Sequence, residues 1–147
     1  MTSPSRDQFR HTIDLAVRWG DMDAVGHVNN ATILQYVESG RIDYFVNVMN
    51  SFGHTEDGPI LGEITCRYVA QLKYPADLIV GTRVVRFSPR TVTLQTGIFV
   101  DDTAELAAVA HATIVWFDYQ AQHATPVPTS IIERVTAYEP AAPAHID

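Results

Sequence analysis

The chain has 147 residues, of which 46% are hydrophobic and 18% are charged, a composition typical of one globular domain. Its net charge of −7, with no run of Lys or Arg, excludes nucleic acid and an anionic membrane surface as expected partners. The single cysteine, Cys66, cannot form a disulfide within the chain, and no apolar stretch has the length of a transmembrane helix. We therefore expect a cytoplasmic protein.

The first half of the chain predicts one strand and one long helix. Apolar and polar residues alternate from Phe9 to Arg18, which is the period of a β-strand. Apolar residues then recur at spacings of three and four between Asn29 and Met49, which predicts a helix of about five turns. Asn29 or Asn30 can cap its N-terminus, and the polar, glycine-containing segment 50–53 ends it.

Four more strands are predicted after the helix, and polar breaks or proline-containing turns separate them. They cover Ile64–Leu72, Leu78–Phe87, Thr91–Val100 and Leu106–Phe117. The short breaks favour an antiparallel meander. A short helix is compatible with Pro128–Val135. We therefore divide the chain into a flexible segment 1–8, a single domain over residues 9–138 and a flexible tail 139–147.

One long apolar helix and five strands predict an α+β architecture. The helix must be shielded from water, and an antiparallel sheet needs one covered face. A curved antiparallel five-stranded sheet wrapped around the helix satisfies both requirements.

The most informative segment is Arg18–Asn30, which reads Arg-Trp-Gly-Asp-Met-Asp-Ala-Val-Gly-His-Val-Asn-Asn. It places two carboxylates and a histidine just before the helix N-terminus, whose unpaired N–H groups and positive dipole end attract negative charge. Asp23 can take a proton from water or attack a carbonyl carbon there, but it can equally cap a turn. Asp21 is interpreted as structural, because it points away from Asp23 if the strand continues through it.

This segment resembles the signature of the 4-hydroxybenzoyl-CoA thioesterase-like family of the hot dog fold. The resemblance continues in the helix through Gln35–Glu38 and Arg41, and it extends from about Phe9 to Val135. It implies the hot dog fold and hydrolysis of an acyl-CoA thioester to a carboxylic acid and free CoA. It also implies a homodimer or homotetramer in which two sheets pair edge to edge and the active site lies at the subunit boundary.

The resemblance also implies roles for single residues. The family carries its catalytic carboxylate at the position of Asp23, and the backbone N–H at the position of Asn30 polarises the thioester carbonyl. Apart from the resemblance, Gly26 is near enough to Asp23 to allow tight backbone approach, and it is a candidate substrate-binding position. His27 either orients Asp23 or the substrate, or is a loop histidine bonded to the backbone, and the structural interpretation is slightly favoured. Ile33 stands where relatives commonly have Tyr, which favours an apolar site for medium-to-long aliphatic acyl chains.

Two further charged positions are weaker candidates. Glu63 is either a second carboxylate of the pocket or a solvated residue at a strand edge. Arg90, in the turn at residues 88–91, is the first candidate to bind the phosphates of CoA, although a solvated charge is an equally good interpretation. Behind it come Arg67, Lys73 and Arg83.

Other chemistries find little support in the sequence. The six histidines are scattered and no HExxH pattern occurs, so neither a metal nor a cofactor is expected. A Ser-His-Asp esterase is disfavoured because the chain has no GxSxG pattern. Two alternatives to a thioesterase stay open: a hot dog hydratase or dehydratase, and a non-catalytic protein that binds an acyl ligand.

Overall fold

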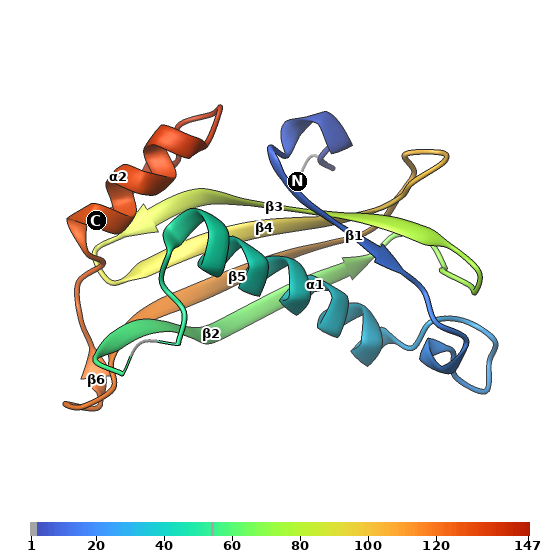
Figure 1. Cartoon of the computed structure of the whole chain (residues 1–147), viewed down its shortest axis with the longest axis horizontal. Helices are drawn as coiled ribbons and strands as arrows, with labels where there is room; N and C mark the ends of the chain where they lie inside the picture. Colours follow the sequence, from blue (N-terminus) through green and yellow to red (C-terminus); the bar gives the residue numbers. More distant parts are fainter. Residues whose placement is uncertain (1–2, 54) are drawn as a thin grey trace.

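A computed structural model describes residues 3–53 and 55–147. Five long strands form one antiparallel sheet in the order β1-β3-β4-β5-β2, and α1 lies against one of its faces (Figure 1). The predicted α+β architecture, a curved sheet around one long helix, is confirmed. The strands are β1 (His11–Ala16), β2 (Asp57–Tyr68), β3 (Asp77–Ser88), β4 (Thr91–Val100) and β5 (Leu106–Asp118).

The long helix is α1 (Asn30–Tyr44), which continues through a π-helical turn, Phe45–Met49. The Oδ1 atom of Asn29 accepts a hydrogen bond of 2.8 Å from the Ala31 N–H, so the predicted cap at Asn29 is confirmed. The helix stops at Asn50, whose φ of 52° is in the left-handed region that Asn tolerates at helix ends. Local sequence signals therefore fix both ends of the helix.

Shorter elements precede β1, connect β1 to α1 and follow β5. They are 3-10 turns at Arg6–Gln8 and Trp19–Asp21, α2 (Thr129–Tyr138), β6 (His123–Ala124) and β7 (Ala144–His145). β7 lies in the tail 139–147 and pairs in parallel with β3. The flexibility that we predict for this tail stays a prediction. Within the described residues, no helix is long and apolar enough to cross a membrane.

The sheet is not the simple meander that the sequence predicted. β3, β4 and β5 follow one another as antiparallel neighbours, but β2 pairs with β5 and forms an edge of the sheet. β2 also runs from Asp57 to Tyr68 rather than over the predicted Ile64–Leu72. Gly58, Pro59 and Gly62 interrupt the alternation of its first half, and proline is tolerated because the strand is at an edge. Residues 69–72 therefore lie in the loop after β2 and not in the sheet.

The core lies between α1 and the concave face of the sheet. Its most deeply buried members are at most 1% exposed and come from the helix and the central strands. They include Val37, Tyr44, Leu78, Val80, Leu94 and Ile98. The first turn of α1 points toward the end of the sheet where β1 stops and β2 ends (Figure 1).

Candidate active site

A cavity of about 350 Å³ lies at the N-terminus of α1. Its walls come from the β1–α1 loop, the first turn of α1, the end of β2 with the loop that follows, and β5. Four residues that the sequence proposed for the site line it together: Asp23, His27, Asn30 and Ile33. The fold therefore gathers the central part of the predicted site in one place.

The β1–α1 loop is a small hairpin that hydrogen bonds hold in shape. The Asp23 N–H donates to the His27 carbonyl at 2.9 Å, and the Gly26 N–H donates to the Asp23 carbonyl at 3.0 Å. Gly26 has a φ of +88°, which residues with a side chain rarely adopt. The Val28 N–H donates to the Leu72 carbonyl at 2.8 Å and so ties this loop to the β2–β3 connection. Gly26 shapes the turn, and the cavity walls are formed by its neighbours.

Asp23 is exposed and lines the cavity. Its Oδ1 atom accepts a hydrogen bond of 2.9 Å from the Val25 N–H, as a turn-capping aspartate does. Among the described residues, the Oδ2 atom has no hydrogen-bond donor. The carboxylate therefore caps a turn and still keeps one oxygen that can meet water or a substrate.

The backbone of Asn30 offers a hydrogen-bond donor at the cavity. Its N–H is in the first turn of α1, where N–H groups have no partner within the helix. The nearby Asn29 Oδ1 atom is already bonded to the Ala31 N–H. In the described part of the chain, the Asn30 N–H thus has no acceptor, and the positive end of the helix dipole adds to its attraction for negative charge.

Asp21 supports the loop from behind. It is buried, and its carboxylate accepts hydrogen bonds from the Tyr36 hydroxyl, the Arg18 N–H at 3.0 Å and the Arg18 guanidinium at 3.2 Å. Burial raises the pKa of Asp21, but these hydrogen bonds outweigh it and leave the pKa below its ordinary value. The structural interpretation fits this geometry, although β1 ends at Ala16 and does not continue through Asp21.

The His27 side chain bonds neither to Asp23 nor to the loop backbone among the described residues. It is half-buried at the cavity wall, and its ring forms no hydrogen bond with a described residue, Asp23 included. Its contribution to the loop comes from its backbone carbonyl, which accepts the Asp23 N–H. The ring is therefore available to a ligand.

Glu63 and Arg90 lie away from the cavity. Glu63 is exposed on β2 next to Ile64, which packs into the core, so strand alternation places Glu63 on the opposite face of the sheet. Arg90 is in the β3–β4 turn, where its carbonyl accepts the Trp116 N–H at 2.9 Å. Trp116 is eight residues along β5 from Ala108, the partner of Tyr68, or roughly 27 Å at the rise of a strand.

Sequence reasoning missed the wall formed by residues 68–72. Tyr68, Gln71 and Leu72 line the cavity, but the predicted strand over Ile64–Leu72 gave them no separate role. Lys73 follows directly in the chain and is exposed, so it is a cation close to the cavity. The only available signal was the turn at residues 74–77, which marks a chain reversal without showing what it faces.

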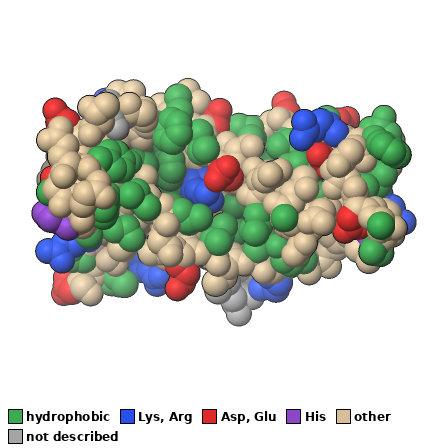
Figure 2. All heavy atoms as spheres, turned by 90° about the horizontal axis from the view of Figure 1, so that it is seen from below, with side chains coloured by type: hydrophobic (Ala, Val, Ile, Leu, Met, Phe, Trp, Pro, Cys, Tyr) green, Lys and Arg blue, Asp and Glu red, His purple; other side chains and the backbone are tan. Residues whose placement is uncertain are grey.

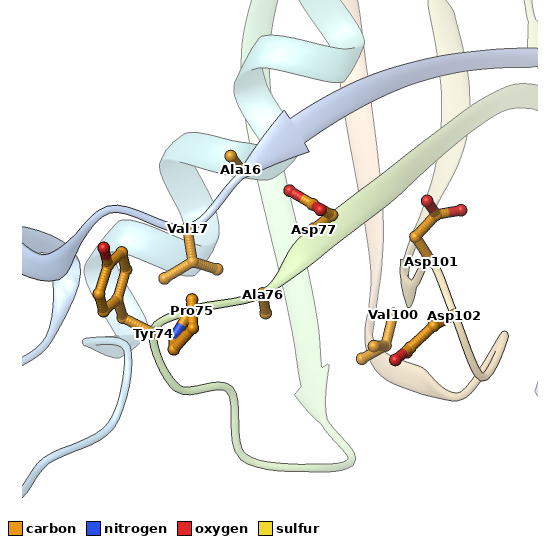
Figure 3. A pocket seen from close by; sticks show the side chains of 9 residues that line it. All are labelled: Ala16, Val17, Tyr74, Pro75, Ala76, Asp77, Val100, Asp101 and Asp102. Atoms are coloured by element: carbon orange, nitrogen blue, oxygen red, sulfur yellow. The ribbon is translucent and has the colours of Figure 1, made fainter.

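A second cavity of about 480 Å³ has the wrong charge for a phosphate-bearing ligand. Figure 3 shows Asp77 at the start of β3 and Asp101 and Asp102 in the β4–β5 turn around it. Three carboxylates repel anions. The cavity at the α1 N-terminus, where helix N–H groups meet apolar side chains, is therefore the better candidate for an acyl thioester.

Comparisons with known proteins identify the family of the chain. The profile of the thioesterase-like superfamily matches residues 17–135. An acyl-acyl carrier protein thioesterase of Arabidopsis thaliana is 27% identical over 131 residues, which cover 87% of this chain and 67% of that protein. A Thermus thermophilus thioesterase crystallised with coenzyme A and Zn has a TM-score of 0.80 and 25% identity, covering 92% of this chain and 98% of that one.

A protein from Pseudomonas aeruginosa has the same fold, with a TM-score of 0.84 at 23% identity over 95% of this chain and 98% of that one. The curved sheet and its helix are those of a hot dog thioesterase. The chain belongs to the thioesterase-like superfamily, and it is a thioester hydrolase.

Proposed function

We propose that this protein hydrolyses acyl-CoA thioesters at the cavity by the α1 N-terminus. The observation that carries the proposal is the meeting of the Asp23 carboxylate and the unpaired Asn30 N–H at one cavity with apolar walls. A carboxylate and an oxyanion donor are the two groups that acyl transfer to water requires. The thioesterase from Thermus thermophilus that was crystallised with coenzyme A supports CoA as the carrier.

Two routes are compatible with these groups. In the first, Asp23 takes a proton from water as the water oxygen attacks the thioester carbon. The C–S bond then breaks, and Asp23 gives the proton to the leaving sulfur, so CoA leaves as its thiol and the carboxylate is restored. In the second, Asp23 itself attacks, the CoA thiolate leaves, and water then hydrolyses the mixed anhydride and restores the carboxylate. In both routes the Asn30 N–H donates to the oxygen on which negative charge develops.

The remaining cavity walls suit an aliphatic acyl chain. Val25, Val28, Ile33 and Leu72 contribute apolar side chains, and Ile33 and Leu72 are both 5% exposed. A hydroxylated aromatic acyl group needs polar partners when it is buried, whereas an alkyl chain does not. We therefore propose medium-to-long aliphatic acyl chains as the substrates. Lys73 is the nearby cation that we propose for the CoA phosphates, in place of Arg90.

We propose that the enzyme acts as a homodimer, and that two such dimers can form a tetramer. Among the described residues, the 12-residue strand β2 pairs with β5 alone and so leaves one edge open. Its residues Ile60, Leu61 and Tyr68 are 37%, 43% and 46% exposed. Figure 2 shows hydrophobic side chains spread over the face that carries α1 and β2. Pairing β2 with its copy in a second subunit gives hydrogen-bond partners to the backbone N–H and C=O groups at this open edge. The cavity is at the C-terminal end of this strand, so the dimer boundary passes beside the site.

A thiol-release assay tests the proposed reaction. The enzyme is given octanoyl-CoA and, in parallel, the same acyl group on acyl carrier protein, and free thiol is measured over time. We expect release from octanoyl-CoA at a higher kcat/KM than from the carrier protein. Release from the carrier protein alone would contradict the choice of CoA. No release from any acyl-CoA between acetyl and palmitoyl would contradict the proposed substrate class.

A further inference from the structure

Tyr68, the last residue of β2, lines the same cavity as Asp23 and Asn30 but reaches it from the sheet edge. Its hydroxyl donates a hydrogen bond of 3.3 Å to the Asn30 carbonyl oxygen. A phenol is protonated at neutral pH, and burial and the neighbouring Cys66 thiol raise the pKa of this one further, so the hydroxyl is a donor. The end of β2 and the start of α1 are thus joined at the cavity.

This contact completes a clamp on one peptide unit. The peptide between Asn30 and Ala31 is held at its carbonyl oxygen by the Tyr68 hydroxyl and at its N–H by the Asn29 Oδ1 atom, at 2.8 Å. Two hydrogen bonds at opposite ends fix the plane of a peptide, because the unit itself is rigid. Rotation about the Asn30 Cα is then restricted, and with it the direction of the preceding N–H.

That preceding N–H belongs to Asn30 and is the donor of the proposed oxyanion site. Oxyanion donors act by being oriented before charge develops, so a group that fixes their direction contributes to catalysis without touching the substrate. Hydrogen bonding to the Asn30 carbonyl also polarises the adjoining helix turn in the same direction as the dipole. The ring of Tyr68 meanwhile forms part of the cavity wall, with 46% of the residue exposed.

We propose that Tyr68 is a positioning residue of this active site. Its hydroxyl holds the Asn30–Ala31 peptide so that the Asn30 N–H faces the thioester oxygen, and its ring contacts the acyl group. The proposal rests on the proposed function of Asn30. It assigns the two parts of one side chain to different kinetic constants: the hydroxyl to kcat, and the ring to KM.

Two variants separate the parts. Tyr68→Phe removes the hydroxyl and keeps the ring, and we expect kcat with octanoyl-CoA to fall about three- to tenfold while KM stays within about twofold. Tyr68→Ala removes both, and we expect KM to rise as well. Tyr74→Phe is the matched control, since Tyr74 is 47% exposed and lines the other cavity. It is expected to leave both constants unchanged.

The backbone amide resonances give a readout that does not depend on activity. In Tyr68→Phe we expect chemical-shift changes for the Asn30 and Ala31 amides and faster hydrogen exchange for the Ala31 amide, which is bonded to Asn29 Oδ1, with the amide of Asp43, near the C-terminal end of α1, unchanged. Unchanged Asn30 and Ala31 amides would overturn the proposal, and so would a fall in kcat matched by an equal fall for Tyr74→Phe. If the wild type releases no thiol from acyl-CoA, the proposed substrate fails, and the amide measurement still decides the role of Tyr68.

Discussion

Gly40 of α1 lies so close to Val80 of β3 that a Cβ atom in its place would be 2.8 Å from the Val80 Cγ1 atom. The same Cβ would be 2.9 Å from the Thr82 Oγ1 atom. Val80 and Thr82 are both 0% exposed, and their branched side chains have few alternative rotamers. Glycine at this helix position is therefore what allows α1 to approach the sheet.

We expect Gly40→Ala to destabilise the protein by up to about 2 kcal/mol. Overpacking of a tight core costs roughly 1–3 kcal/mol, and the better helix propensity of alanine returns about 1 kcal/mol. Urea unfolding followed by circular dichroism measures the difference. Ser39→Ala, at an exposed neighbouring position, is the control and should change the unfolding free energy by less than about 0.5 kcal/mol. A Gly40→Ala protein more stable than the wild type would refute the close-packing argument.

Asp23→Asn is expected to keep the fold and to lower kcat by about 10²–10⁴-fold. The amide oxygen of Asn can still accept the Val25 N–H, so the turn is preserved, but the neutral group is neither a base nor a nucleophile. Steady-state kinetics with octanoyl-CoA gives the loss, and a thermal unfolding curve checks the fold. Asp21→Asn is the contrasting variant: it should lower stability first, because Asp21 is buried and bonded to Tyr36 and Arg18. Wild-type turnover of Asp23→Asn would remove the carboxylate from the mechanism.

The value of kcat/KM should climb with acyl chain length until the cavity is full. Each buried CH₂ contributes at most about 0.8 kcal/mol, or roughly fourfold, to the stabilisation of the transition state. A series from acetyl-CoA to palmitoyl-CoA, with hydroxybenzoyl-CoA as the polar comparison, measures this dependence. Equal activity along the whole series, or a preference for hydroxybenzoyl-CoA, would contradict the apolar assignment of the site around Ile33.

Glu139 is predicted to make stability depend on pH. Burial raises the pKa of Glu139 above the ordinary 4.5, and this outweighs the hydrogen bonds that Oε2 accepts from the Tyr44 hydroxyl at 2.8 Å and the Val84 N–H at 3.0 Å, which lower it. The Oε1 atom is buried with no partner in the described part of the chain. The folded state therefore holds this proton more tightly than the unfolded state. The stabilisation is fully present below about pH 4.5 and is lost as the pH rises through the folded-state pKa.

Glu139→Gln isolates this contribution, since Gln does not titrate. Urea unfolding at several pH values between 4.5 and 8 should show the variant gaining stability relative to the wild type as the pH rises. The other titrating groups are common to both proteins and cancel in the difference. A difference that stays constant over this range, or that shrinks with rising pH, would show that Glu139 does not titrate as the buried geometry requires.

Leu61→Lys is expected to weaken the proposed dimer. A lysine on an edge strand opposes pairing with another strand, and the two copies would bring their charges together. Light scattering at micromolar concentration should show a dimer or tetramer for the wild type and a smaller species for the variant. Val46→Lys, at a residue 47% exposed in the last turn of the long helix, is the control. A fully active wild-type monomer would contradict the dimer.

Much of the fold and part of the site could be predicted from the sequence, because the signals are local. The β-branched residues and the polar breaks on either side give β4 its bounds, Thr91–Val100, and the cap at Asn29 places the start of α1. Asp23, His27 and Asn30 are within eight residues of one another at a strand-to-helix turn, so any fold that forms this turn brings them together.

Only the tertiary structure decided which residues of the sheet face the strand-to-helix turn across the cavity. The pairing of β2 with β5 is long-range, and no local period distinguishes it from pairing with β3. This choice brings Tyr68 and Leu72 to the cavity, turns Glu63 to the opposite face and leaves Arg90 at the far end of the sheet. The alternation of apolar and polar residues predicts which face of its own strand a residue occupies. Its neighbours on other strands depend on which strands pair and bury their apolar faces together.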